Sequence, residues 1–156
     1  MGILLRGALL GAGAGAAGTA ALDAATYLDM AVRGRPASST PQQTIEKLAD
    51  TAGVAIPGSE EQQQARVAGL GPLLGFAAGV GAGAVVGVAR ALMPRRQWWS
   101  TFALAAAVGM LAGNAPMTAL GVTDPRQWSA ADWASDVIPH LAYAGTAATI
   151  LGRLDP

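Results

Sequence analysis

Long apolar stretches alternate with shorter polar ones along this chain of 156 residues. The apolar stretches cover about 3–30, 72–93, 98–120 and 134–151, and a polar loop, 33–66, separates the first two. Each stretch is close to the roughly 20 residues that a helix needs to cross the hydrocarbon core of a bilayer. The pattern predicts an all-α integral membrane protein, a four-helix bundle that forms a single membrane domain over residues 1–156.

The polar loop contains the pattern of a short amphipathic helix. Thr40 is followed by Pro41 and, three residues on, by Gln43, which together predict a capped helix start. Apolar residues then recur at helical spacing up to a glycine that ends the helix: Ile45, Leu48, Ala49, Ala52 and Gly53. We expect this helix to lie on the membrane or on the other helices. Ser59 with Gln62 predicts a second cap, at the start of the helix that leads into the next span.

Glycine recurs every fourth residue in the second span and, more briefly, in the first. The positions are Gly71, Gly75, Gly79, Gly83 and Gly87, and then Gly7, Gly11 and Gly15, followed by Thr19. In a water-soluble helix each interior glycine costs about 1 kcal/mol relative to alanine. In a bilayer, small residues four apart let two helix backbones approach closely. We therefore predict glycine-mediated helix packing, with either the first span of the same chain or a second copy as the partner.

Breaks and anchors delimit the spans. Gly71–Pro72 predicts a kink at the start of the second span, and Gly113–Pro116 predicts an interruption of the third. The residues 94–97 form a predicted tight turn. Four tryptophans are expected to anchor the helices at the two membrane–water interfaces: Trp98, Trp99, Trp128 and Trp133.

The first span also has features of a secretory signal peptide. One arginine, Arg6, precedes an apolar stretch that is followed by small residues. Its core of alanine and glycine is only weakly apolar for a signal sequence. We therefore favour a retained helix.

The composition fits a membrane protein and excludes several functions. Only 13% of the residues are charged, against about 25% in an average soluble domain. The net charge is zero, so no basic surface indicates nucleic-acid binding. The chain has no cysteine, which excludes disulfides and thiolate metal sites. No nucleophile elbow, phosphate loop or HExxH motif is present, and we expect neither a cofactor nor catalysis.

The distribution of charge predicts the orientation. The turn between the second and third spans carries Arg90, Arg95 and Arg96 without an acid, whereas the next connection is acidic. Cytoplasmic loops carry the excess of arginine and lysine, so both termini are expected in the cytoplasm. Nine arginines against one lysine, with abundant alanine and glycine, suggest a bacterial genome. We therefore predict a bacterial plasma-membrane protein.

One group of polar residues is predicted to converge near the outer face. Asp132, Asp136 and His140 share a face of the last helix, because they are four residues apart, and Tyr143 lies one turn on. At about 1.5 Å per residue, two residues from other spans reach a similar depth. These six residues, the polar cluster, are Asp23, Asn114, Asp132, Asp136, His140 and Tyr143.

Ionisable residues inside a membrane indicate a functional site, because isolated charges are costly there. A structural explanation competes with this one. The two acids of the last helix lie near its N-terminus, where the helix dipole favours them, and His140 could simply hydrogen-bond to Asp136. A metal is a weaker alternative, because no second motif completes a ligand shell. The sequence leaves structural, proton or ligand, and metal interpretations open, in that order of preference.

The order of these features resembles the YagU-like family of small bacterial inner-membrane proteins. The matching residues are Pro116–Met117, the segment 121–125, Trp133, and Asp136 followed by His140–Leu141. The resemblance covers the second half of the chain best, and Pro139 directly before the histidine departs from the pattern. It implies a location and an architecture rather than a reaction.

Together these observations predict a small polytopic membrane protein without catalytic activity. Its expected partners are the lipid bilayer and either further copies of itself or a larger membrane complex. The alternative is a small transporter, channel or proton-linked protein that uses the polar cluster.

Overall fold

The computed structural model describes residues 2–93 and 97–154, and every regular element in these ranges is a helix. The helices are α1 (Ile3–Arg33), α2 (Thr40–Ala52), α3 (Glu60–Leu92), α4 (Trp98–Ala119), the short 3₁₀ helix η1 (Pro125–Gln127) and α5 (Ala130–Leu154). The all-α prediction is confirmed for the described chain. Most of the predicted tight turn at 94–97 lies outside the described residues.

Local sequence signals explain most helix ends. Gly34 and Gly53 follow α1 and α2 with φ of 65°, a left-handed conformation that glycine adopts without a side-chain penalty. Ser59 and Gln62 form the predicted capping box of α3. Ser39, rather than Thr40, is the residue that precedes the first turn of α2.

Two prolines lie inside continuous helices. The predicted interruption of the third span is wrong, because α4 continues through Pro116 and ends at Ala119. Pro72 likewise lies within α3, which runs without a break from Glu60 to Leu92. Neighbouring helices can supply contacts that offset the backbone hydrogen bond lost at a proline.

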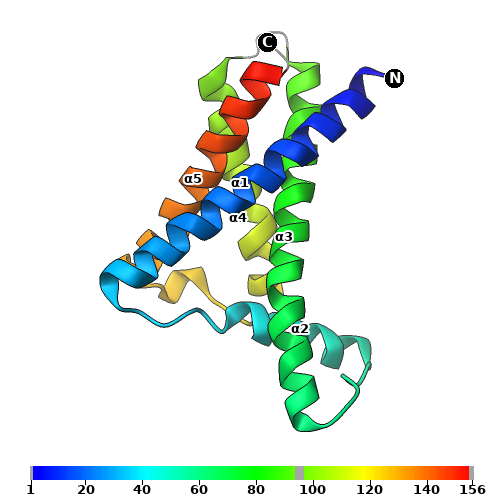
Figure 1. Ribbon diagram of the computed structural model, residues 1–156, viewed down its shortest axis with the longest axis vertical. Helices are drawn as coiled ribbons and strands as arrows, with labels where there is room; N and C mark the ends of the chain where they lie inside the picture. The colour runs from blue at the N-terminus through cyan, green and yellow to red at the C-terminus, as the bar shows by residue number, and fades with distance from the viewer. Residues whose placement is uncertain (1, 94–96, 155–156) are drawn as a thin grey trace.

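Four long helices pack together, and α2 packs beside one of them (Figure 1). α1 crosses α3 and also packs along α5, while α4 contacts both α3 and α5. α2 contacts α3. The start of α1 and the end of α5 lie at the same end of the molecule (Figure 1).

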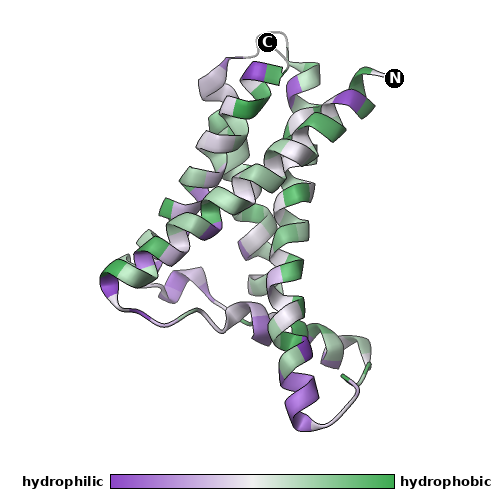
Figure 2. Cartoon of the chain, in the orientation of Figure 1, coloured by the Kyte–Doolittle hydropathy of each residue, from purple (hydrophilic) through white to green (hydrophobic). Residues whose placement is uncertain are grey.

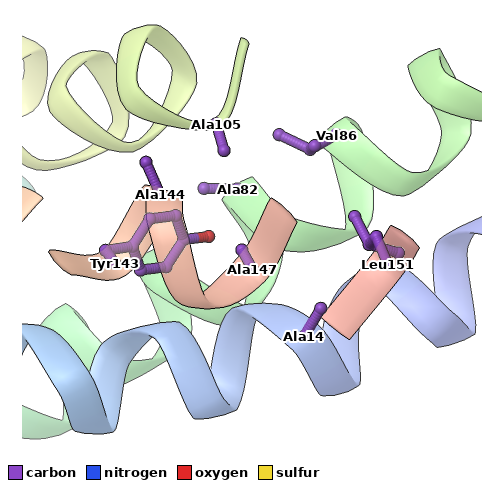
Figure 3. Packing of buried hydrophobic residues seen from close by; sticks show 8 residues of the cluster. All are labelled: Ala14, Ala82, Val86, Ala105, Tyr143, Ala144, Ala147 and Leu151. Carbon is purple, nitrogen blue, oxygen red and sulfur yellow. The ribbon is translucent and has the colours of Figure 1, made fainter. Parts of the chain in front are cut away.

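Small residues fill the interior of the bundle, and large apolar residues face outward. Figure 3 shows the buried cluster, in which alanines from several helices surround the larger side chains Val86, Tyr143 and Leu151. Most of the leucine and isoleucine side chains lie instead on the outer surface, where Leu73, for example, is 60% exposed. The hydropathy colouring in Figure 2 shows green, apolar stretches along the long helices. In water this arrangement would leave most of the hydrophobic surface exposed.

Three helices, α1, α3 and α4, are long and apolar enough to cross a membrane. α5 has 25 residues, but it carries Asp136, His140 and two threonines and is not among these three. A membrane-embedded all-helical protein is thus supported. The fourth span at 134–151 remains a prediction.

Candidate functional site

α1 and α3 meet through backbone rather than side chains. A Cβ atom added to Gly7 would lie 2.7 Å from the carbonyl oxygen of Gly87, and one added to Gly15 would lie 2.5 Å from that of Gly79. Between these two contacts, a Cβ atom added to Gly11 or to Gly83 would lie even closer to the carbonyl oxygen of the other residue. Real Cβ atoms essentially never approach other heavy atoms more closely than 3.0 Å, so these glycines cannot be replaced without moving a helix. We call this set of residues the α1–α3 glycine contact.

The glycine contact is intramolecular and stops at Thr19. The hydroxyl of Thr19 lies directly against Gly79 and donates a 2.9 Å hydrogen bond to the carbonyl oxygen of Gly15. Of the two partners left open by the sequence, the structure pairs α3 with the first span of the same chain.

Two members of the predicted glycine series do not belong to this contact. Nothing lies within 4 Å of a Cβ atom added to Gly75, because α1 and α3 have diverged at this level. Gly71 packs against Pro41 of α2, 3.1 Å away, and not against another long helix. Within the described chain, Gly75 therefore contacts no other helix, and Gly71 packs α3 against α2 rather than against another span. A contact of Gly75 with a second copy stays a prediction.

Tyr143 of α5 connects all four long helices. Its ring lies between Gly18 of α1 and Gly109 of α4, where added Cβ atoms would be 2.7 and 3.3 Å from ring carbons. Its hydroxyl donates a 2.7 Å hydrogen bond to the carbonyl oxygen of Gly79 in α3. The side chain is buried in the cluster of Figure 3. Tyr143 thus acts as the central packing residue of the bundle.

Asn114, Asp136 and His140 form one connected group between α4 and α5. The Asn114 side-chain amide donates a 2.9 Å hydrogen bond to Oδ2 of Asp136. His140 Nδ1 lies 2.7 Å from the backbone oxygen of Asp136 and 3.5 Å from its Oδ1. A carbonyl oxygen only accepts, so Nδ1 carries the proton and a neutral His140 has its free lone pair at Nε2. We call these three residues the Asn–Asp–His group.

Glycines of α4 make room for the rings of α5. An added Cβ atom at Gly113 would lie 3.3 Å from Nε2 of His140, one helical turn beyond the contact of Gly109 with Tyr143. Both side chains of α5 therefore fit into a shallow groove on α4. The His140 and Asp136 side chains are 13% and 17% exposed, so the group is mostly enclosed.

The other two acids of the polar cluster lie apart from this group. Asp132 accepts hydrogen bonds from the backbone N–H of Ser129, at 2.9 Å, and from its hydroxyl, at 2.6 Å. These bonds lower the pKa of Asp132 and cap the start of α5. Asp23 is exposed on α1, and within the described chain it makes no hydrogen bond or ion pair. The predicted convergence of all six residues is wrong, because Asp132 serves as a cap and Asp23 lies on an exposed side of α1.

A second polar connection joins the end of α1 to the start of α5. Asp29 pairs with Arg33, one turn later, and with Arg35. Arg33 also donates a hydrogen bond to the hydroxyl of Ser135. At the opposite end of the bundle, buried Arg90 of α3 donates a 2.7 Å hydrogen bond to Thr101 of α4. Polar side chains thus link neighbouring helices at both ends.

The tryptophans occur as two pairs on either side of α4. Trp98 and Trp99 stand edge to face at its start, with ring centroids 4.5 Å apart. Trp128 and Trp133 form a similar pair beyond its end, with centroids 5.0 Å apart. The indole N–H groups of Trp98 and Trp128 donate to threonine hydroxyls, at 3.2 and 2.8 Å. The amphipathic rings therefore have both apolar and polar neighbours, as membrane-interface tryptophans require.

The glycines that receive the rings of Tyr143 and His140 were not predicted as such: Gly18, Gly109 and Gly113. The sequence singles out Gly113 only as part of a predicted break in the third span. The spacing of four between Gly109 and Gly113 was a usable signal, since it matches the series in the second span. Which aromatic residue a glycine faces depends on helix rotation, which spacing alone does not give.

The site offers hydrogen-bonding and proton-accepting groups rather than a metal shell. Among the described residues, no three histidine, cysteine, aspartate or glutamate side chains come together to hold a metal ion. Over the described residues, the fold and site define an all-helical protein with three potential membrane spans. Most of its buried polar groups are hydrogen-bonded to one another or to the backbone. No known family matches the chain, and neither a curated protein nor a solved structure is significantly similar to it.

Proposed function

We propose that this protein is a non-catalytic integral membrane protein that acts as a homo-oligomer or as an accessory subunit of a larger complex. The distribution of side-chain sizes carries the proposal. Alanine and glycine make up most of the interior, whereas most leucine and isoleucine side chains lie on the outside. Bilayer lipids tolerate large apolar side chains on the surface, and van der Waals packing of small residues holds membrane helices together.

The tryptophan pairs support a transmembrane position. α4 has 22 residues, and at 1.5 Å per residue it measures about 33 Å, close to the thickness of the hydrocarbon core. One pair opens α4 and the other follows its end. Both are thus at the level where tryptophan is enriched in membrane proteins. On this placement α5, which runs back beside α4, supplies the fourth span.

Charge supports the orientation with both termini in the cytoplasm. Three arginines lie in helix turns at the end of the bundle that holds the start of α1 and the end of α5: Arg6, Arg90 and Arg153. The opposite end carries the acidic residues Asp124 and Asp132, and its basic residues Arg33, Arg35 and Arg126 are paired with acids. The resemblance to the YagU-like family, although short, agrees with a small bacterial plasma-membrane protein.

The internal pairing of polar groups supports a role in assembly. The glycine contact and the Asn–Asp–His group are used within the chain, and α5 is held by Tyr143. The outward apolar faces are therefore the surfaces available to other membrane proteins. Mass spectrometry of the protein released from native membranes in mild detergent tests this role. We expect a homo-oligomer or a complex with a defined partner, and a monomer that carries only lipid would contradict the proposal.

A second candidate, a proton-linked membrane protein, is favoured by the Asn–Asp–His group. Proton flux into vesicles that contain the purified protein and a trapped pH-sensitive dye distinguishes the two. Flux that exceeds that of empty vesicles, and that is lost in His140→Ala while the protein remains inserted, would favour the second candidate. The first proposal predicts no flux above the empty vesicles.

A further inference from the structure

The polar-to-apolar boundary of α3 coincides with the point where α2 crosses it. The first turns of α3 are polar, from Glu60 to Arg66, and exposed leucines begin at Leu70. α2 contacts α3 there, through Pro41 against Gly71. Figure 1 shows α2 running across α3 rather than along it.

The same level is the end of the membrane-spanning part of α4. The Arg90–Thr101 hydrogen bond fixes the register of the antiparallel helices α3 and α4. Counting equal numbers of residues from this bond places Gly71 opposite Leu120, just past the end of α4. α2 therefore lies at the level of the second tryptophan pair, and the polar start of α3 extends further.

One side of α2 faces the polar start of α3 and the segment that joins the two helices. Glu46, Ala49 and Asp50 line a shallow depression together with the joining residues 54–56 and with Gln63 of α3. This side therefore faces the extramembrane segment. Leu48 is two residues from both Glu46 and Asp50, which is about 200° around a helix and thus nearly the opposite side. Leu48 is 41% exposed, so an apolar side chain is accessible on the side of α2 opposite the extramembrane segment.

We infer that α2 is an interfacial helix, and that its Leu48 side inserts into the boundary between lipid headgroups and acyl chains. The occupant of this face is the bilayer itself. Leu70 and Leu73, on either side of the Gly71 contact in α3, are exposed as well. Lys47, adjacent on the same helix, is exposed and can extend its ammonium to the phosphates. This inference rests on the transmembrane position that we propose above.

Site-directed spin labelling tests the inference on the full chain, which has no native cysteine. Leu48→Cys and Asp50→Cys, both exposed and nearly opposite on α2, are labelled with a nitroxide in phosphatidylcholine vesicles. Collision with oxygen, which concentrates in lipid, is compared with collision with a water-soluble nickel chelate. We expect the label at position 48 to favour oxygen several-fold over the label at position 50.

Two results would overturn the inference. Equal nickel access at both positions would place α2 in water, and low access to both reagents at position 48 would show that protein covers this face. A label at Leu111, which is 64% exposed in the middle of α4, reports the transmembrane position independently. Oxygen access at position 111 with nickel access at 48 rejects only the interfacial helix, whereas nickel access at 111 rejects the transmembrane position as well.

Discussion

The hydroxyl of Tyr143 donates a hydrogen bond to the carbonyl oxygen of Gly79, the same residue whose missing side chain lets Thr19 approach from α1. Gly79 thus receives two neighbours at once, one on its Cα and one on its carbonyl oxygen. α1, α3 and α5 are held together at this point, and Gly109 of α4 packs against the same tyrosine ring. The packing of the bundle depends strongly on this small region.

Tyr143→Phe removes only the hydroxyl and should destabilise the protein by about 0.5–1.5 kcal/mol. The loss is modest, because the Gly79 carbonyl can keep its helical hydrogen bond in α3. Denaturation in mixed micelles measures the change. Tyr27→Phe, at a side chain that is 65% exposed, serves as the control and should leave the unfolding free energy unchanged. Equal effects of the two variants would contradict the central role of Tyr143.

Gly83→Ala should cost about 1–3 kcal/mol or prevent folding, because the new methyl group meets the backbone of Gly11 and Gly15. Gly81→Ala is the matched control on the same helix. Nothing lies within 4 Å of its added Cβ atom, so its unfolding free energy should stay the same or rise slightly. If both variants behave alike in a thermal unfolding assay, the glycine contact does not hold α1 to α3.

Asn114→Leu should destabilise the protein by about 0.6–2 kcal/mol, since it removes the donor to Asp136 inside the bundle. Asp23→Leu should have no such cost, because this carboxylate makes no described hydrogen bond or ion pair and faces outward. Unfolding free energies of both variants in the same micelles provide the comparison. A large loss in Asp23→Leu would show that Asp23 has a partner outside this chain or in its undescribed residues.

Asp124 should titrate below the ordinary range of an aspartate. Hydrogen bonds from Arg126, first, and then from Gln127 lower its pKa. The contribution of this pair to the 124–128 turn is therefore complete above the ordinary aspartate pKa, and it is lost as the pH falls through the lowered value. Carbon-13 NMR of the carboxyl group checks this. Arg126→Ala should raise the pKa toward its ordinary value, and an unchanged pKa would contradict the ion pair.

Single cysteines test the orientation. A cysteine at Gln97 should be protected from a membrane-impermeant thiol reagent on intact cells, and one at Gln127 should react. Both side chains are exposed, so a difference between them reports the side of the membrane rather than burial. The reverse pattern would place the termini outside the cytoplasm.

Periodicity and caps predicted the helices well, because both depend on neighbouring residues. The capping box at Ser59 and the stop at Gly53 are examples. The continuity of α4 through Pro116 was not predictable in this way, since a helix can retain its course when other helices pack around a proline. The fourth span is the hardest to recognise from composition. Polar residues that pack inside a bundle lower the mean hydropathy of a helix as much as exposed polar residues do.

The candidate site could be predicted only in part. Asp136 and His140 were paired correctly, because helical spacing brings residues four apart onto one face. To place Asn114 beside them, one must know how α4 is positioned lengthwise against α5. The estimates of depth in the membrane gave this position approximately. Asp23 was placed in the same cluster because its depth is similar. Depth along a helix says nothing about the direction in which α1 and α3 diverge. At the level of Gly75 these two helices have already separated.

The α1–α3 glycine contact also restricts how this sequence can change over time. Every replacement of a glycine adds atoms, so no substitution at Gly11 or Gly83 is smaller than the original, and a compensating loss on the other helix is impossible because that side is glycine too. Outward-facing positions such as Leu73 can meanwhile exchange freely among apolar residues. Diverging descendants of this protein should therefore share the spacing of their glycines long after the identity of their other residues has been lost.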